Sequence, residues 1–493
     1  MVIKSGREQK ITPASAGERE TFVEQNLAIG QDRRSFLARA GVLALAPLAA
    51  NVAASNEAVA APASGKFDFD TPLNRIGTDS VHWDMAIRDE HMTKIIAGMG
   101  VADMDFRCAP AITEALQKRV AFPNWGYNLI DVDLFMGKAG NSPFIKGVMD
   151  WNKRRYGINV IDPTMIGVTP GVIPGIINAL QAFAPKGSKV LMATPNYSGF
   201  YAAIGFTQTV PEESLMKQVN GRYEIDWADF ERRMTPDVKV SILCNPHNPV
   251  GRAWTREELT RYGELCLKHN IIVLADEIHC DFVSKGQKYV PFSTLARNIV
   301  DNSITFKSGS KSFSLAAMKC AWFFSTNPKL FQATNAKAFP TISNPAMVAE
   351  QAAYAGGEEW LTQCVDYIDG NLGFAHQYIT SNIPLIKIGN KPEGTYLMWL
   401  DVSAVADKVG AKKMADQANS KPMGKNPFTG GPVTVSQADI LSHWFAQNSN
   451  VFLESGSGFG LGGENHLRMN IATSRRTLKA ALDSVSGALK NLA

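Results

Sequence analysis

The chain has 493 residues, of which 45% are hydrophobic and 19% are charged, which is typical of soluble globular proteins with two or three domains. The formal net charge is +4 at pH 7 and no run of lysines and arginines marks a basic patch, so the composition does not favour nucleic-acid binding. The six cysteines and eight histidines form none of the usual metal-binding spacings. We therefore predict no metal site, and buried free thiols for the cysteines in apolar segments.

The first 60 residues predict a cleaved export signal. Arg33 and Arg34 precede a short apolar stretch and then a cleavage sequence, Ala58-Val59-Ala60. The run RRSFL resembles the twin-arginine type of signal. The apolar stretch is too short to span a bilayer comfortably, and an amphipathic N-terminal helix is the alternative. We expect export by the twin-arginine machinery, a periplasmic location and no membrane span in the mature protein.

The rest of the chain divides into segments of different pattern. Residues 61–80 are expected to be a linker and residues 81–120 an N-terminal segment. Between residues 121 and 345, short apolar runs alternate with helical patterns, which is typical of an α/β domain with a largely parallel sheet. The predicted strands are residues 165–169, 189–194, 240–244, 271–276 and 303–306. Residues 346–493 predict a smaller α+β domain, in which the polar stretch 408–436 is expected to form a surface loop.

Chemically useful residues follow these predicted strands at their carboxyl ends, where open parallel sheets bind ligands. In chain order they are Gly171, Val172 and Ile173, then Tyr197, Asn248, Asp276, His279, Ser308, Ser310 and Lys311. Taken singly, each has an ordinary structural explanation, such as a turn or a helix cap. Together they offer a lysine for a Schiff base, a carboxylate, hydroxyls and a helix start, which is what pyridoxal phosphate requires of its site.

The motifs around these residues resemble a known superfamily. NPVG (248–251), DEIH (276–279) and SGSK (308–311) resemble fold-type I pyridoxal-phosphate enzymes of the class I/II aminotransferase superfamily. The stretches VADMDF (101–106), NWGYN (124–128), EGTYLMWLD (393–401) and HLRMNIA (466–472) resemble its MalY/PatB-type cystathionine β-lyase group. The resemblance runs from about residue 80 to the C-terminus. It implies an α/β fold with a large domain, a mostly parallel central sheet flanked by helices, and a smaller C-terminal α+β domain.

The resemblance also implies roles for individual residues. Lys311 would bind the cofactor covalently and move the Cα proton, Asp276 would pair with the ring nitrogen, and Tyr197 would stack on the ring. Arg468 would hold the substrate carboxylate with its planar fork. The other implied cofactor contacts are Gly171, Val172, Ile173, Asn248, His279, Ser308, Ser310, Lys319 and, reaching across from the second subunit of a homodimer, Tyr127.

Two positions bear on the choice of reaction. Lys319 stands where many aminotransferases have an arginine, so it can supply charge to a phosphate but not a bidentate fork. His279 stands where many aminotransferases have a tyrosine, and histidine is usual in the lyase group. The sequence therefore favours a C–S β-lyase acting on cystathionine or cysteine-conjugate-like amino acids. An aminotransferase is the alternative, and a non-catalytic regulatory or binding protein is disfavoured by the complete residue set.

Overall fold

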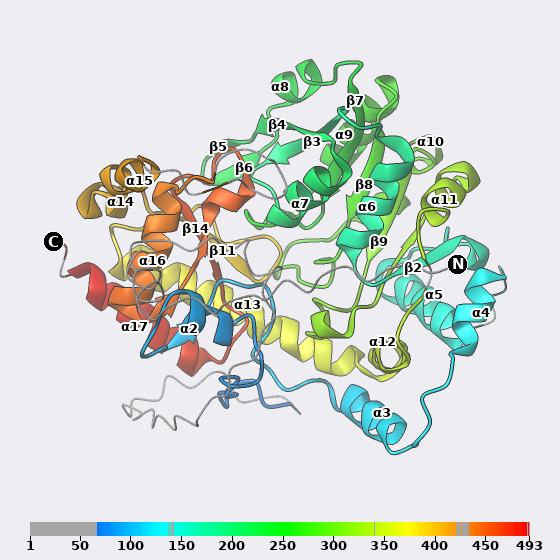
Figure 1. Cartoon of the computed structure of the whole chain (residues 1–493), viewed down its shortest axis with the longest axis horizontal. Helices are drawn as coiled ribbons and strands as arrows, with labels where there is room; N and C mark the ends of the chain where they lie inside the picture. The colour runs from blue at the N-terminus through cyan, green and yellow to red at the C-terminus, as the bar shows by residue number, and fades with distance from the viewer. Residues whose placement is uncertain are drawn as a thin grey trace, which may run out of the picture.

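The computed structural model describes residues 67–136, 138, 140, 142–339, 341–420, 424, 433–490 and 492. The predicted export signal, including Arg33 and Arg34, lies outside these residues. Figure 1 shows an α/β part around one large sheet, beside a smaller part built from the C-terminal elements. Among the described residues, none of the helices combines the length and apolar character that crossing a membrane requires.

A seven-stranded sheet forms the centre of the α/β part, in the order β2-β10-β9-β8-β7-β3-β4. Its strands are β2 (Ile166–Thr169), β3 (Lys189–Thr194), β4 (Val210–Leu215), β7 (Val238–Cys244), β8 (Ile272–Asp276), β9 (Ser303–Lys307) and β10 (Ala321–Phe324). Only β10 pairs antiparallel to its neighbours; the other pairs are parallel. The five predicted strands and the mostly parallel α/β fold are confirmed. The edge strand β4 was not predicted because its sequence, VPEESL, is polar and largely exposed.

Helices cover both faces of this sheet, which is why its central strands are mostly apolar. One face packs against α6 (Val172–Phe183), α7 (Ser198–Thr207) and α11 (Pro328–Asn335). The other face packs against α8 (Trp227–Arg232), α9 (Arg256–Lys268) and α10 (Arg297–Val300). A third cluster of buried side chains includes residues of α5 (Pro143–Tyr156) and α12 (Asn344–Gly356) and extends into the C-terminal part. The predicted site residues thus follow strands that are mostly buried.

The smaller part is an antiparallel sheet with helices on it. Its strands, in the order β11-β14-β13, are β11 (Leu397–Asp401), β14 (His466–Asn470) and β13 (Glu454–Ser455). Its helices are α13 (Glu358–Asn382), α14 (Ser403–Val409), α15 (Ala411–Asn419), α16 (Gln437–Ser449) and α17 (Arg475–Lys490). The prediction of a loop over residues 408–436 is wrong at α15. This helix buries only Ala411 and Ala415, so it leaves a weak apolar signal in the sequence.

The N-terminal segment connects the two parts. Helix α2 (Asp84–Asp89) packs on α16, and β1 (Ala97–Gly98) pairs in parallel with β12 (Val451–Phe452). Helix α3 (Pro110–Val120) then packs on α12. Residues 99–105 lie between these contacts and run past the carboxyl end of the large sheet. The domain boundaries predicted at residues 120 and 345 stay predictions.

Short elements complete the described chain. They are α4 (Leu129–Phe135), β5 (Lys217–Val219), β6 (Arg222–Glu224) and the 3₁₀ turns Pro163–Met165, Phe292–Thr294, Ala316–Met318 and Gly456–Phe459. All six cysteines are free, and all but Cys108 are buried, which confirms the prediction of buried thiols.

Candidate active site

The carboxyl ends of β2, β3, β7, β8 and β9 meet at one edge of the sheet, because these strands run in the same direction. The loop after each strand carries one or more of the predicted residues. Asn248 and Arg468 are in direct contact there: the Arg468 guanidinium donates a hydrogen bond to Asn248 Oδ1 over 3.2 Å. Strand β14 of the smaller part therefore reaches the same site as the loops of the large sheet.

Lys311 provides a half-buried amine at this edge of the sheet. Its Nζ donates a hydrogen bond to the backbone oxygen of Ala102 over 2.6 Å. Burial, and next the positive charge of Arg468, lower the pKa of Lys311 to about 8. A substantial fraction of this amine is therefore neutral near pH 8, and the neutral form is the nucleophile needed to attack a carbonyl group.

Asp276 ends β8 as a buried carboxylate that is 3% exposed. Its Oδ1 accepts a hydrogen bond from the Ile278 amide over 3.0 Å, and it forms no close ion pair with any described residue. Burial raises its pKa to about 7, against the opposing charge of Lys311. A buried carboxylate without a cation fits a ligand that brings a protonated ring nitrogen to it.

The start of α6 provides the predicted phosphate cradle. Gly171 precedes the helix, and Val172 and Ile173 form its first turn, with Pro174 following. Backbone amides of a first helical turn have no acceptor within the helix, and the helix dipole favours an anion there. Thr169 Oγ1 donates to Gly171 O over 2.9 Å and fixes the entry to the turn.

The serines and Lys319 are placed differently from one another. The Ser308 hydroxyl donates to Cys320 O over 2.6 Å and accepts from the Ser310 amide. It therefore links the loop of residues 308–314, the lysine loop, to the residue before β10. Ser310 is half-buried beside it. Lys319 is exposed and has a left-handed backbone with φ of +61°. Its charge still acts on Lys311, because it contributes to the lowered pKa of that amine.

Two aromatic side chains and one exposed tyrosine complete the predicted set. Tyr197 stands at the start of α7, half-buried, with its ring packed edge-on against Phe200. His279 is buried edge-on against Tyr396, and burial followed by the charge of Lys311 holds its pKa well below the usual range, so it is neutral. Tyr127 is fully exposed between α3 and α4 and contacts none of the other predicted site residues.

Sequence reasoning missed the carboxylate that supports the lysine loop. Glu350 of α12 is 1% exposed; it accepts a hydrogen bond from the Gly309 amide over 2.5 Å and another from the Tyr354 hydroxyl over 2.8 Å. The Tyr354 hydroxyl in turn accepts from Trp322 Nε1. No local pattern signals this role, because Glu350 follows Gly309 by 41 positions on a separate helix.

Lys307, at the end of β9, has a structural role. The side chain is buried beside the ring of Tyr156, with Nζ 4.2 Å from the ring centroid, and it donates to the Tyr289 hydroxyl over 3.2 Å. Buried Glu277 accepts from the same hydroxyl over 2.5 Å. These contacts direct Lys307 into the protein beneath the site.

Glu350→Gln is expected to flatten the dependence of stability on pH. Burial raises the pKa of Glu350 to about 7, whereas an unfolded glutamate titrates near 4.5. Between these values the folded chain holds a proton that the unfolded chain releases. In the unaltered chain, the Glu350 carboxyl should therefore lower the free energy of unfolding by about 3 kcal/mol as pH rises from 4.5 to 7. The glutamine variant should lack this decrease. Urea unfolding of the cofactor-free chain across this range tests it. The exposed Glu264→Gln on α9 is the control, and equal pH profiles for both variants would contradict the assignment.

A lowered-pKa lysine, a buried carboxylate awaiting a cation and an open helix start on the edge of a parallel sheet define a pyridoxal-phosphate enzyme. Sequence comparison agrees: the family model "Aminotransferase class I and II" matches residues 95–485, and the chain belongs to this family. The cofactor of this chain is pyridoxal 5′-phosphate, and the chain is an enzyme of the C–S lyase or aminotransferase type.

Individual relatives cover nearly the whole chain. "Cystathionine beta-lyase PatB" of Bacillus subtilis is 32% identical over 86% of this chain and 100% of its own length. The structure of cystalysin from Treponema denticola, which contains pyridoxal 5′-phosphate, is 26% identical, covers 87% of this chain and 100% of its own, and superposes with a TM-score of 0.74. The PLP-bound C-S lyase of Staphylococcus hominis is 28% identical, covers 86% of this chain and 98% of its own, and has a TM-score of 0.72.

Proposed function

We propose that the protein is a pyridoxal-phosphate-dependent C–S β-lyase that acts on cystathionine or cysteine-conjugate-like amino acids. The products are a thiol, pyruvate and ammonia, with one water consumed. The observation that carries the proposal is the placement of the Lys311 amine at the same sheet edge as Arg468 and Asp276. The names of the relatives favour elimination of a thiol over amino transfer.

The site residues divide the work of such a reaction. Pyridoxal phosphate, when bound, withdraws electrons from the substrate Cα and makes its proton acidic. Asp276 would hold a protonated ring nitrogen, because a buried carboxylate needs a cation. Arg468 would bind the substrate carboxylate through its two terminal nitrogens, which Asn248 and Gly100 now occupy. Lys311 would take the Cα proton, since its lowered pKa suits a base near neutral pH.

Incubating the loaded enzyme with cystathionine separates the two candidate reactions. The lyase should release pyruvate and free thiol in equal amounts with no keto acid added. Product formation only after a keto acid is supplied would instead identify an aminotransferase. A chain that stays colourless after loading with pyridoxal phosphate would contradict both functions.

We also propose a homodimer whose sites are shared between subunits. Between α3 and the middle of α4 the chain exposes several large apolar side chains, namely Phe122, Trp125, Tyr127, Leu129 and Val132. Apolar surface of this kind is typical of an interface. If Tyr127 serves the partner's site, mixing Lys311→Ala chains with Tyr127→Ala chains should restore activity, because mixed dimers contain one intact site. A monomer in sedimentation, or a mixture as inactive as its parts, would refute this arrangement.

Export by the twin-arginine route is the third part of the proposal. Replacing Arg33 and Arg34 with lysines should leave the enzyme inside the cell, as measured by fractionation. The same double replacement at Arg232 and Arg233, an exposed and a partly buried arginine at the C-terminal end of α8, is the control for arginine loss in general. Normal export of the Arg33 and Arg34 variant would rule this route out.

A further inference from the structure

The backbone of residues 100–102 contacts both cations of the candidate site. Ala102 O accepts hydrogen bonds from Lys311 Nζ over 2.6 Å and from the Tyr396 hydroxyl over 3.1 Å. Gly100 O accepts from the Arg468 guanidinium over 2.7 Å. The position of this short segment therefore affects where the amine and the guanidinium lie.

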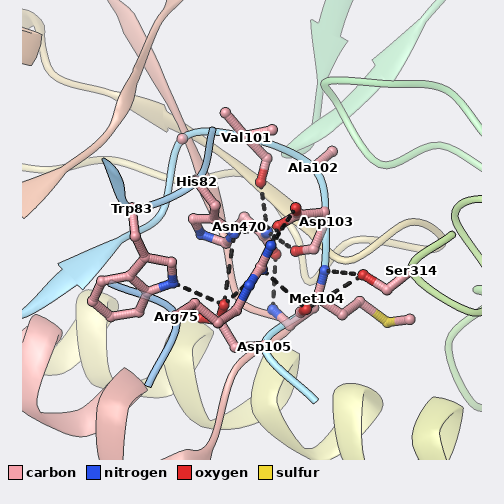
Figure 2. Close-up of polar contacts among 12 residues, drawn as sticks. Arg75, His82, Trp83, Val101, Ala102, Asp103, Met104, Asp105, Ser314 and Asn470 are labelled. Carbon is pink, nitrogen blue, oxygen red and sulfur yellow. Dashed lines mark hydrogen bonds and ion pairs between the residues drawn. The ribbon is translucent and has the colours of Figure 1, made fainter. Parts of the chain in front are cut away.

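Arg75 binds the next three residues, Asp103, Met104 and Asp105, which continue residues 100–102 into one segment, residues 100–105. Its guanidinium donates to both carboxylate oxygens of Asp103, each over 2.9 Å, and to Asp105 over 3.0 Å. A further bond reaches Met104 O over 3.2 Å. Figure 2 shows the Arg75 guanidinium between the carboxylates of Asp103 and Asp105. One planar fork thus binds three consecutive residues, which a single ammonium group cannot do in the same geometry.

His82 and Trp83 make the remaining side-chain contacts to the carboxylates of Asp103 and Asp105. His82 Nδ1 lies 2.5 Å from Asp103 Oδ1, and Trp83 Nε1 donates to Asp105 over 2.9 Å. His82 and Asp105 are almost fully buried. Burial alone would lower the pKa of His82, but the charges of Asp105 and Asp103 raise it. Arg75 and His82 therefore both face the two carboxylates, whose charges favour the protonated form of His82.

The cluster also has the spacing of a metal site, but its carboxylate oxygens already accept hydrogen bonds from protein side chains. His82, Asp103 and Asp105 each place a ligand atom within 4.8 Å of the others. One carboxylate oxygen of Asp103 and one of Asp105 accept hydrogen bonds from Arg75, which supplies the positive charge that an ion would bring. The cluster is therefore better explained as a clamp on the chain than as a cation site.

Strand β14 and the lysine loop are joined to the clamped segment directly. Asn470 Nδ2 donates to Val101 O over 2.7 Å and to Asp103 O over 2.5 Å, and it lies on the same strand as Arg468. The Met104 amide donates to Ser314 Oγ over 3.0 Å, three residues after Lys311. Figure 2 shows these bonds converging on the segment from both sides. A shift of this segment would therefore change the contacts of both Lys311 and Arg468.

We propose that Arg75 and His82 are positioning residues, which act through Asp103 and Asp105 to hold the carbonyls of Ala102 and Gly100 against Lys311 and Arg468. The proposal rests on the proposed function for the roles of those two cations. It predicts that the clamp sets the proton affinity of the free lysine amine, because both the Ala102 carbonyl and the Asp103 charge favour the ammonium form. The other charges acting on that amine are Arg468, Asp276 and Lys319, and none of them changes in the test below.

Asp103→Asn in the full-length, cofactor-free chain tests this. The amide keeps the shape of the side chain but loses the ion pairs. Competitive acetylation with labelled acetic anhydride over a pH series, followed by mass spectrometry of the Lys311 peptide, gives the pH midpoint of the amine. We expect the midpoint to fall by about half a pH unit or more. Hydrogen exchange of the amides of residues 101–105 should accelerate at least about tenfold, a loss of local stability of about 1.4 kcal/mol.

Three further variants distinguish a positioning role from a role in overall stability alone. Lys391→Met removes a comparable partly buried ion pair, with Asp369, outside the cluster, and it should lower the thermal midpoint without moving the Lys311 midpoint. Arg75→Lys should retain part of the exchange protection that Arg75→Met loses. An unchanged Lys311 midpoint in Asp103→Asn, with stability lost as in Lys391→Met, would overturn the proposal. Acetylation reads the free amine, so this result does not depend on whether thiol release is observed.

Discussion

Lys311→Ala is expected to abolish thiol release, with a loss of at least about a thousandfold in turnover. The substitution removes the amine that would bind the cofactor and take the Cα proton. Its chain should still fold, because the removed Nζ makes a single described hydrogen bond, to Ala102 O. Pyruvate formation from cystathionine by the loaded enzyme, with circular dichroism to check the fold, measures the effect.

Lys319→Ala is the matched control for that result. Lys319 is exposed and carries the same charge eight positions later, so its loss should mainly weaken cofactor retention. Excess pyridoxal phosphate should restore most of the activity of this variant and none of that of Lys311→Ala. Equal and total loss in both variants would show that the division of roles between the two lysines is wrong.

Asp276→Asn is expected to lower kcat/KM at least about a hundredfold, because a neutral amide cannot stabilise a protonated ring nitrogen. The same substitution should increase the stability of the cofactor-free chain. Burial raises the pKa of Asp276 to about 7, so in the cofactor-free chain its ionised form costs free energy as pH rises through that value. The asparagine variant should therefore be the more stable chain at pH 8, as measured by urea unfolding.

Asp369→Asn makes the same chemical change at a partly buried carboxylate that pairs with Lys391 away from the site. It should leave kcat/KM unchanged and lower stability slightly. If Asp276→Asn behaves like this control in both measurements, Asp276 does not contact the reacting group.

The sequence predicts the site residues that lie in the loops directly after the strands of the large sheet. Each predicted strand ends in a loop with a chemically distinctive residue, and parallel pairing brings those loops to one edge. Asp276, Asn248 and Lys311 could therefore be assigned before the structure was known. Strand β10 was not predicted because its short apolar sequence, AWFF, follows another apolar run without a turn signal.

The supporting residues could not be predicted, because they act over long sequence separations. Glu350 reaches the lysine loop from a separate helix, and Arg75 binds Asp103 and Asp105 from the N-terminal segment. An isolated arginine or glutamate is usually a solvated surface charge, so nothing local distinguishes these two. Their roles depend on burial and on partners that only the folded chain brings together.

The central claim is that the cofactor is bound at Lys311, and one measurement tests it most directly. The loaded full-length enzyme is reduced with borohydride, digested, and its peptides are mapped by mass spectrometry. The account predicts that the reduced cofactor is found on the peptide containing Lys311. Attachment to Lys307 or Lys319, or no attachment to any peptide, would contradict it.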